Sequence, residues 1–195
     1  MKLGIIGGSG LYDLRDAIEA EWIKVNTPWG EPSDEILKCH INNKEVIFLP
    51  RHGRGHKINP SNVNYRANID ALKQNNVTDV ISISAVGSLK EEHQPGKFIL
   101  IDQFIDRTYA RKKTFFDDEI VAHVSMAKPI CQQLSKICEN ALEELEIDHS
   151  NKGTYLAMEG PQFSTFAESC LYRSWGLDVI GMTNMPEAKL AREAE

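Results

Sequence analysis

A short apolar run that ends in a glycine-rich turn is the feature that most constrains the fold. Leu3–Ile6 has the composition of a buried strand, and Gly7-Gly8-Ser9-Gly10 follows it directly. In α/β proteins such a turn often lets backbone N–H groups converge on a phosphate. The same pattern also forms plain strand–helix corners, so the turn alone leaves both interpretations open.

Two common nucleotide-binding motifs do not fit this turn. A dinucleotide fingerprint beginning at Gly8 would need glycine at its sixth position, where the chain has Asp13. A Walker loop would need a Gly-Lys-Ser/Thr sequence, which does not follow. The turn therefore favours a simpler anion site.

Strand-like and helix-like segments alternate along the rest of the chain. This alternation predicts one α/β domain over residues 1–195, with a mixed, largely parallel central sheet flanked by helices. We expect the apolar face of the helix over residues 130–147 to pack on that sheet. The expected strands are 45–49, 80–83, 98–101, 154–158 and 178–182, and the expected helices are 61–75, 130–147, 164–175 and one that begins at Pro186.

Composition limits the possible partners and location. The 195 residues are 42% hydrophobic, enough for a sizeable core, and the net charge of -6 gives no general attraction to nucleic acid or to an anionic membrane. Four cysteines are scattered without the spacing of a metal site or a disulfide framework. No apolar stretch resembles a signal peptide or a membrane span. We therefore expect a cytoplasmic protein with reduced thiols.

Two later segments add candidate anion contacts. Arg51-His52-Gly53-Arg54-Gly55-His56 places four basic side chains after the strand 45–49, and arginine and histidine donate well to phosphate. Ser84-Ala85-Val86-Gly87-Ser88 combines hydroxyls with small residues after the strand 80–83. The first segment is also compatible with a solvated basic loop, and Arg54 could instead form a structural ion pair. The pattern of the second segment is common in ordinary strand-to-helix turns.

Aromatic and sulfur-containing residues follow two of the later strands. Phe163, Met182 and Met185 are suited to contact a planar base or a thioether. Residues of these types are also frequent in protein cores, so both roles remain open.

Taken together, seven ordered segments resemble the methylthioadenosine phosphorylase family, from residue 3 to the end of the chain. Asp102–Thr108 and Met182–Glu187 favour this branch over the phosphorylases that prefer inosine and guanosine. The segments are Gly4–Asp13, Arg51–His56, Asn64–Asn68, Ser84–Ser88, Asp102–Thr108, Glu159–Ser164 and Gly181–Glu187.

The resemblance implies roles for individual residues. Met182 corresponds to a ribose-binding position, Phe163 to an aromatic residue against the nucleoside, and Ser164 to a position linked to base selectivity. His123 resembles a histidine that a neighbouring subunit lends to the 5′-methylthio pocket. Gln162 departs from the family, where arginine is usual. The implied phosphate-binding residues are Ser9, Arg51, His52, Ser84, Ala85 and Thr183.

The resemblance also implies an activity. S-methyl-5′-thioadenosine would be cleaved by phosphate to adenine and 5-methylthioribose 1-phosphate in a homotrimer or homohexamer, with phosphate as co-substrate and without a metal or organic cofactor. The expected general acid, an aspartate, would lie beyond residue 195. Because the final helix also stops without an end signal, we expect a C-terminally truncated domain that lacks its last strands and helices and is itself inactive.

Two other functions remain open at this point. One is a 6-oxopurine nucleoside or methylthioinosine phosphorylase, which would differ in its base-recognising residues. The other is a non-catalytic nucleotide- or phosphate-binding module.

Overall fold

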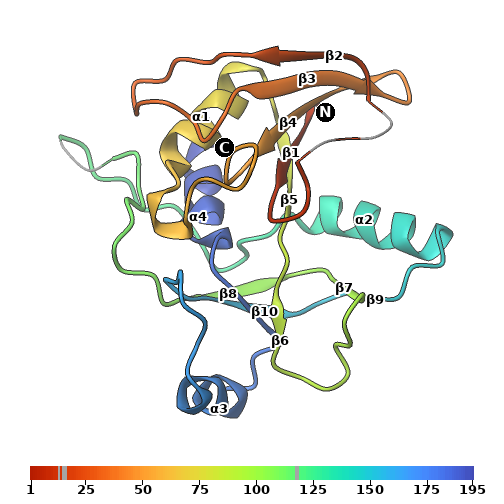
Figure 1. Ribbon diagram of the computed structural model, residues 1–195, viewed down its shortest axis with the longest axis vertical. Coiled ribbons are helices and arrows are strands. Elements are labelled where there is room, and N and C mark those ends of the chain that lie inside the picture. Colours follow the sequence, from red (N-terminus) through yellow and green to blue (C-terminus); the bar gives the residue numbers. More distant parts are fainter. Residues whose placement is uncertain (13, 15–16, 117–118) are drawn as a thin grey trace.

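The computed structural model describes residues 1–12, 14, 17–116 and 119–195, so Asp13 of the glycine-rich segment lies outside the described residues. The upper part of the molecule in Figure 1 is a sheet of five strands in the order β2-β3-β4-β1-β5. Strand β1 runs parallel to both β4 and β5, whereas β2, β3 and β4 are joined antiparallel. The strand bounds are β1 Leu3–Gly7, β2 Ile18–Ile23, β3 Ile36–Ile41, β4 Lys44–Pro50 and β5 Asp79–Ile83.

A second sheet lies in the lower half and has the order β6-β11-β10-β8. Strand β10 is parallel to both β8 and β11, and β6 is antiparallel to β11. A small parallel pair joins β7 to β9. The bounds are β6 Gly87–Ser88, β7 Phe98–Ile99, β8 Gln103–Asp106, β9 His149–Ser150, β10 Thr154–Ala157 and β11 Val179–Gly181.

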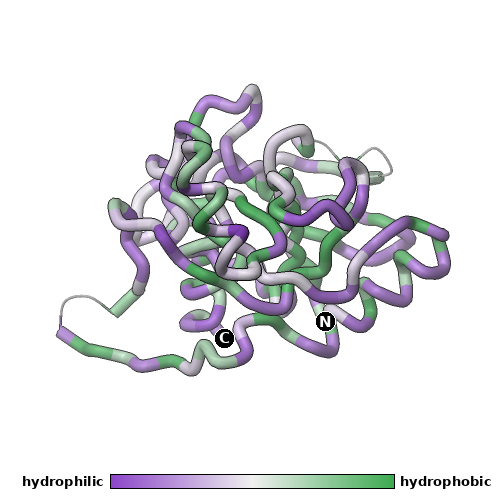
Figure 2. Tube along the Cα trace, turned by 90° about the horizontal axis from the view of Figure 1, so that it is seen from below, coloured by the Kyte–Doolittle hydropathy of each residue, from purple (hydrophilic) through white to green (hydrophobic). Residues whose placement is uncertain are grey.

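Two helices pack side by side against one face of the first sheet (Figure 1). They are α1, Tyr65–Gln74, and α4, Asn184–Ala194, and a short 3-10 turn, η1 (Pro60–Asn62), leads into α1. Figure 2 shows several hydrophobic segments passing through the interior of the fold. The core residues here include Ile6, Ile47, Leu49, Ile69, Leu72 and Leu190.

The described residues confirm the predicted α/β class and most of the expected elements. The sequence did not predict strands β2, β3, β6, β8 and β9. In β2, the residues from Ile18 to Glu21 are exposed, so the segment has no apolar alternation by which it could be recognised. The predicted strand 98–101 shortens to β7, and the final helix takes regular geometry only after Met185, whose φ of -123° and ψ of 130° are extended.

The expectation for helix α2, Gln132–Glu144, is wrong in one respect. Its face was expected to pack on the sheet, yet no residue of α2 is fully buried. Ile137 is 48% exposed, and Leu145 just after the helix is 69% exposed. Hydrophobic periodicity identifies such a face, but it does not say whether the described part of the chain covers it.

The remaining helix, α3, extends from Phe166 to Ser174 at the bottom of Figure 1. Its N-terminus is capped by Thr165 and Glu168 in a reciprocal capping box. All four cysteines are free thiols, as expected. Among the described residues, no helix is long and apolar enough to cross a membrane.

Candidate functional site

The carboxyl ends of three neighbouring strands, β1, β4 and β5, meet at one edge of the first sheet. Because the three strands are parallel, the glycine turn, the basic loop and the segment after Ile83 emerge together. The Arg51 amide donates to the Gly7 carbonyl at 2.9 Å, which joins the first two of these loops. Three segments that are distant in the sequence therefore form one site.

Arg51 is fully buried and uses its whole guanidinium on protein acceptors. Nε and Nη2 donate to the two Glu187 oxygens at 2.8 and 3.0 Å. Nη2 also donates to Ser82 Oγ at 2.6 Å, and Nη1 donates to Ile83 O at 3.2 Å and Ser84 Oγ at 3.1 Å. These contacts account for all five N–H groups of an arginine. The bidentate fork expected to grip phosphate is instead directed at Glu187.

Burial by itself would lower the pKa of Arg51, but the charge of Glu187 and the hydrogen bonds to it raise the pKa. The guanidinium therefore remains charged in the interior. Its charge is compensated by Glu187, so the site offers an incoming anion less net positive charge than the sequence suggests.

Hydroxyl groups cluster beside Arg51. Ser84 Oγ lies 3.2 Å from Thr183 Oγ1 and donates to Asn184 Oδ1 at 3.0 Å. Thr183 follows β11, in the second sheet, and its side chain is buried. Hydroxyls can rotate to donate to an anion, and Asn184 Oδ1 is an acceptor that a phosphate oxygen can replace. The structure thus brings together Arg51, Ser84 and Thr183, three residues expected to bind phosphate.

Gly8 lets the first loop approach this cluster. A Cβ atom added at Gly8 would lie 2.6 Å from Ile83 O and 2.9 Å from Arg51 Nη1. Any side chain there would displace the backbone of the β5 loop or the guanidinium. Ser9 and Ala85 are exposed at the same end of the sheet, on the loops after β1 and β5.

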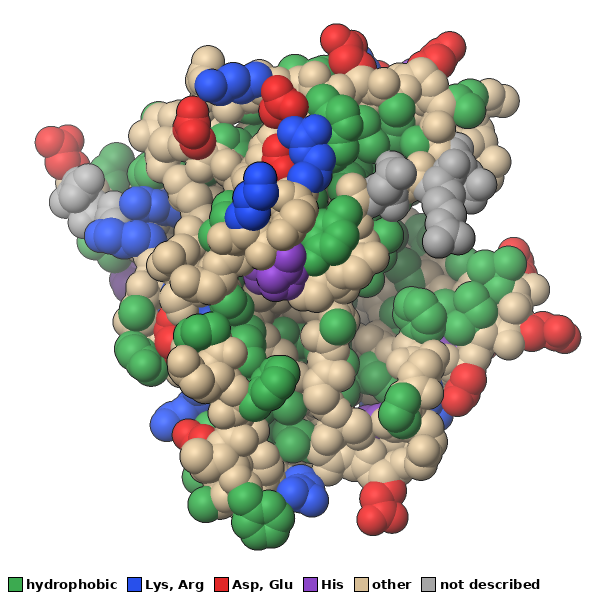
Figure 3. Space-filling view, viewed as in Figure 1, with side chains coloured by type: hydrophobic (Ala, Val, Ile, Leu, Met, Phe, Trp, Pro, Cys, Tyr) green, Lys and Arg blue, Asp and Glu red, His purple; other side chains and the backbone are tan. Residues whose placement is uncertain are grey.

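The other basic side chains of this loop make contacts within the protein. Arg54 forms a surface ion pair with Asp34 and Glu35, as one of the two sequence interpretations allowed. His52 is buried and hydrogen-bonds through Nδ1 to Ile58 O at 2.8 Å, and its ring stacks on that of His56. Burial lowers the pKa of His52, and the neighbouring Arg51 and His56 lower it further. Figure 3 shows acidic side chains beside the basic ones over this part of the surface.

A second buried arginine organises the segments around Met182. Arg111 Nη1 donates to the carbonyls of Met182 and Met185, the latter at 2.7 Å, and to Tyr65 Oη at 3.2 Å. Its Nη2 donates to Glu159 O at 2.6 Å, and its Nε to Glu159 Oε1 at 3.3 Å. Arg111 therefore holds the backbone at Met182, the expected ribose contact, against the segment that begins at Glu159.

Glu159 is the acceptor at the centre of this arrangement. It accepts from Ser61 Oγ, from Tyr109 N at 2.6 Å and from Ala110 N at 3.2 Å. Burial would raise the pKa of Glu159, but these hydrogen bonds and Arg111 outweigh burial and lower the pKa. The carboxylate is ionised and engaged, and it is therefore poorly suited to donate a proton.

The other expected substrate contacts lie on exposed segments. Phe163 is 89% exposed, and Ser164 Oγ contacts Ser169 Oγ at 2.8 Å. His123 is also exposed, and it lies on the stretch 119–126, which extends from the body as an arm in Figure 2. Within the described residues of this chain, these three side chains do not join the Arg51–Ser84–Thr183 cluster.

Sequence reasoning missed Ser82, Glu187 and Arg111 as parts of the site. Glu187 and Ser82 lie within or beside quoted motifs, but a motif does not say which side chains pair. Arg111 had no signal beyond its place in a charged segment. Its role depends on contacts with residues 46 to 74 positions away.

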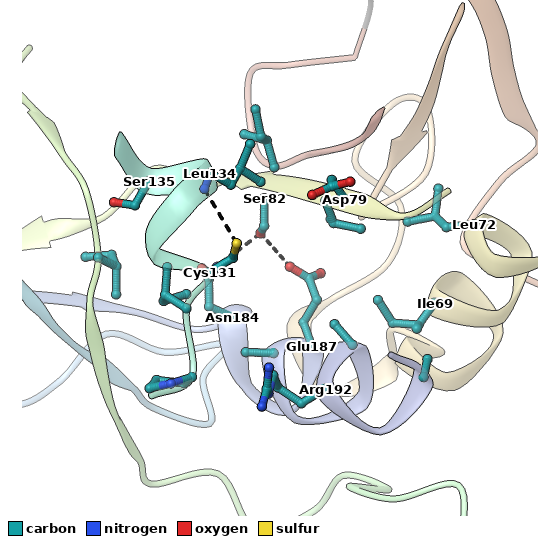
Figure 4. Close-up of a pocket in the computed structure, with 18 of the residues that line it drawn as sticks. Ile69, Leu72, Asp79, Ser82, Cys131, Leu134, Ser135, Asn184, Glu187 and Arg192 are labelled. Atoms are coloured by element: carbon teal, nitrogen blue, oxygen red, sulfur yellow. Dashed lines mark hydrogen bonds between the residues drawn. The ribbon is translucent and has the colours of Figure 1, made fainter. Parts of the chain in front are cut away.

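An apolar groove of about 390 Å³ lies behind the site, between β5, α4 and the start of α2. Figure 4 shows Ser82 and Glu187 pointing toward each other at its inner wall, with Ile69 and Leu72 of α1 on one side and Leu134 on the other. Strand β5 is an edge strand of the sheet, so one side of its backbone faces this groove without a partner strand. The Arg51–Glu187 pair therefore separates the hydroxyl cluster from an apolar space.

Comparisons with known proteins identify similar phosphorylases. The chain is 59% identical over 193 residues to the S-methyl-5′-thioadenosine phosphorylase of Cereibacter sphaeroides, covering 99% of this chain and 67% of that protein. It is 61% identical to the enzyme of the same name from Rhodospirillum rubrum, of which it covers 66%. The chain thus spans about two thirds of the length of these curated relatives.

A solved structure of methylthioadenosine phosphorylase from Schistosoma mansoni in complex with adenine has a TM-score of 0.94 and 36% identity. The match covers 99% of this chain and 77% of that one. A methylthioadenosine phosphorylase from an antarctic soil metagenomic library has a TM-score of 0.93 and 50% identity, covering 97% of this chain and 67% of the other. The family model of the phosphorylase superfamily matches residues 2–195. The chain belongs to the phosphorylase superfamily.

Proposed function

We propose that the protein phosphorolyses S-methyl-5′-thioadenosine, giving adenine and 5-methylthioribose 1-phosphate. The observation that carries the proposal is the convergence of Arg51, Ser84 and Thr183 at the strand ends. This convergence supports a phosphate-binding site. Two relatives, 59% and 61% identical to this chain, are named S-methyl-5′-thioadenosine phosphorylase. The whole protein would be a pentosyltransferase in purine and methionine salvage.

The chemistry follows from where charge develops. Phosphate attacks C1′ of the ribose while the bond to the purine breaks, so a cationic sugar forms between an anion and a departing base. The departing purine takes up a proton to become adenine, and the expected general acid, an aspartate, would supply it. Ser84 and Thr183 would donate their hydroxyl protons to phosphate oxygens, with Ser9, the Ala85 N–H and His52 around the same anion. Inorganic phosphate is the co-substrate, and no metal or organic cofactor takes part.

Arg51 acts on phosphate mainly through Ser84 in this proposal. Its Nη1–H already donates to Ser84 Oγ, which leaves the serine proton free to move from Asn184 Oδ1 to a phosphate oxygen. A direct contact would require Nη1 to exchange Ser84 or Ile83 O for phosphate.

The remaining expected residues would contact the nucleoside. Met182 would bind the ribose, and Phe163 and Ser164 would face the base. In a homotrimer or homohexamer, His123 would reach the 5′-substituent of the nucleoside bound to a neighbouring subunit. The domain would span residues 1–195 and function in the cytoplasm.

The test of the reaction uses the product of the complete reading frame, because this chain spans about two thirds of its curated relatives. We expect adenine release from S-methyl-5′-thioadenosine only when phosphate is present. Equal release without phosphate would indicate a hydrolase. Faster cleavage of inosine or guanosine would identify a 6-oxopurine enzyme, and phosphate binding without any release would identify a binding module.

The test of the site compares Ser84→Ala and Thr183→Ala with Ser174→Ala, an exposed serine on α3. A hydrogen bond to a charged group contributes about 1.5–3 kcal/mol, so each site variant should raise the KM for phosphate by roughly tenfold or more. Ser174→Ala should leave KM unchanged. An unchanged phosphate KM in both site variants would remove these hydroxyls from the anion site.

A further inference from the structure

A polar hollow of about 660 Å³ lies away from the hydroxyl cluster, beneath the end of α2. Figure 1 shows β9 passing below α2 on the right of the molecule. The wall of the hollow is formed by α2, by β9 and by the segment around His93. None of these residues belongs to the proposed phosphorolysis site.

Three potential metal ligands meet in this hollow. Glu139 and Glu143 are four residues apart on α2, so they lie on the same face of the helix. The chain then turns back and brings His149 of β9 beside them. One ligand atom from each of the three residues lies within 4.8 Å of the other two.

The hydrogen bond made by His149 leaves one of its nitrogens free to bind a metal. Nδ1 lies 2.9 Å from Ile147 O, and because a carbonyl only accepts, Nδ1 carries the proton. In the neutral ring, Nε2 then has a free lone pair. Metal-binding histidines are commonly oriented in this way by a backbone carbonyl.

Charge also favours a cation at this position. Two carboxylates four residues apart on a helix repel each other. Lys136 contacts Glu139 Oε2 at 2.8 Å, and Asn151 donates to Oε1 at 3.1 Å. Lys136 also interacts electrostatically with Glu143, so one ammonium group serves both carboxylates.

The distances suit a small ion after a modest adjustment. Ligand atoms about 2.1 Å from a tetrahedral zinc are about 3.4 Å apart. Closing the three residues from 4.8 Å to that separation requires only side-chain movement of the order of 1 Å. Glu143 is exposed and can make this movement by changing its rotamer.

A second observation in the same hollow is independent of the cluster. His93 is buried, and its Nε2 contacts Asp178 Oδ1 at 3.0 Å. Its Nδ1 is also buried and has no hydrogen-bond partner among the described residues. A buried polar atom without a partner is costly, and a bound water or other ligand commonly accounts for one. His93 lines the same hollow as the three ligands, so its wall includes a buried nitrogen without a partner among the described residues.

We infer that Glu139, Glu143 and His149 form a binding site for a divalent transition metal of the Zn²⁺ type. Two carboxylate oxygens and one imidazole nitrogen are a suitable set for such an ion, with water completing the coordination. The imidazole discriminates against Mg²⁺, which prefers oxygen ligands. The site ties the end of α2 to β9 and takes no part in the proposed phosphorolysis.

The experiment titrates the metal-free 195-residue protein with Zn²⁺ by calorimetry and by thermal unfolding, with Mg²⁺ as the comparison ion. We expect saturable binding of one Zn²⁺ and a higher Tm, because an ion that binds only the folded state stabilises it. His149→Ala and Glu143→Gln should weaken Zn²⁺ binding by roughly tenfold or more. Glu144→Gln and His123→Ala are matched controls on exposed residues outside the cluster, and both should bind as the unchanged protein does.

Circular dichroism of each variant establishes that it is folded before its affinity is compared. Absence of saturable Zn²⁺ binding would overturn the inference. Binding that survives in both His149→Ala and Glu143→Gln, or that is matched by Mg²⁺, would also overturn it, since the ion would then be held by general surface charge. Because these measurements require no turnover, failure of the metal site and failure of the proposed phosphorolysis are distinguished.

Discussion

Removal of one partner from the Arg51–Glu187 pair should destabilise the fold strongly. In Glu187→Leu, the fully buried guanidinium loses two charge-assisted hydrogen bonds, of 2.8 and 3.0 Å. At about 1.5–3 kcal/mol each, these contacts correspond to a loss of about 3–6 kcal/mol. This range agrees with the roughly 3–5 kcal/mol measured when other buried pairs lose one charge. The loss is a large part of the roughly 5–15 kcal/mol by which most domains are stable.

The assay is urea unfolding of Glu187→Leu, Arg51→Met and the double variant, followed by circular dichroism. The double variant should be less destabilised than the sum of the singles, with a coupling of about 2–3 kcal/mol, because it leaves no uncompensated charge. Arg54→Met is the control: its pair with Asp34 is partly exposed, so its loss should cost roughly 0.2–1 kcal/mol. A Glu187→Leu loss as small as that of Arg54→Met, or strictly additive single variants, would refute the reasoning.

Three further predictions concern the glycine turn, histidine protonation and a helix cap. Gly8→Val should abolish phosphate binding measured by calorimetry, because its Cβ would collide with Ile83 O and Arg51 Nη1. Gly10→Ala should retain binding, because its Cβ meets no neighbouring atom, although the φ of 90° at this position strains alanine and should lower stability. Equal binding in both variants would contradict the close approach. The lowered pKa of His52 means that the unfolded chain binds its proton more readily, so stability should fall as pH decreases through the ordinary histidine pKa of about 6.5. His52→Gln should weaken that dependence in urea titrations, and identical slopes would show that His52 is not responsible. Thr165→Ala removes the cap of α3 and should cost about 1 kcal/mol of unfolding free energy, and an unchanged urea midpoint would argue against the capping box.

Local sequence patterns predicted the strands and loops whose structure depends mainly on residues close in the sequence. The apolar run before Gly7 predicted β1, and the strand–helix–strand unit over residues 45–83 predicted that β4 and β5 are parallel. Both strands pair in parallel with β1, which lies between them. These inferences succeed because a strand followed by a helix returns to the same sheet in a parallel direction. The order of the motifs likewise located the three loops that meet at the site.

Hydrophobic periodicity was less informative for helices and strands that have a face not covered by another part of the described chain. It correctly indicated an apolar face on α2, but the exposure of Ile137 shows that this face is not covered. It gave no sign of β2, whose residues from Ile18 to Glu21 are exposed on an edge strand. An amphipathic pattern records what an element can bury, whereas its partner is set by the rest of the fold.

The sequence by itself determined the α/β class and which loops carry the candidate chemistry. Only the tertiary structure decided how the charged groups are used. Arg51 was expected to grip phosphate, but its guanidinium pairs with Glu187, 136 positions along the chain. Such a pairing has no local signal, because it depends on two segments meeting in space. A buried charge is stable only beside a counter-charge inside the fold. The fold brings Arg51 and Glu187 together, and neither of the two motifs that contain them indicates this pairing by itself.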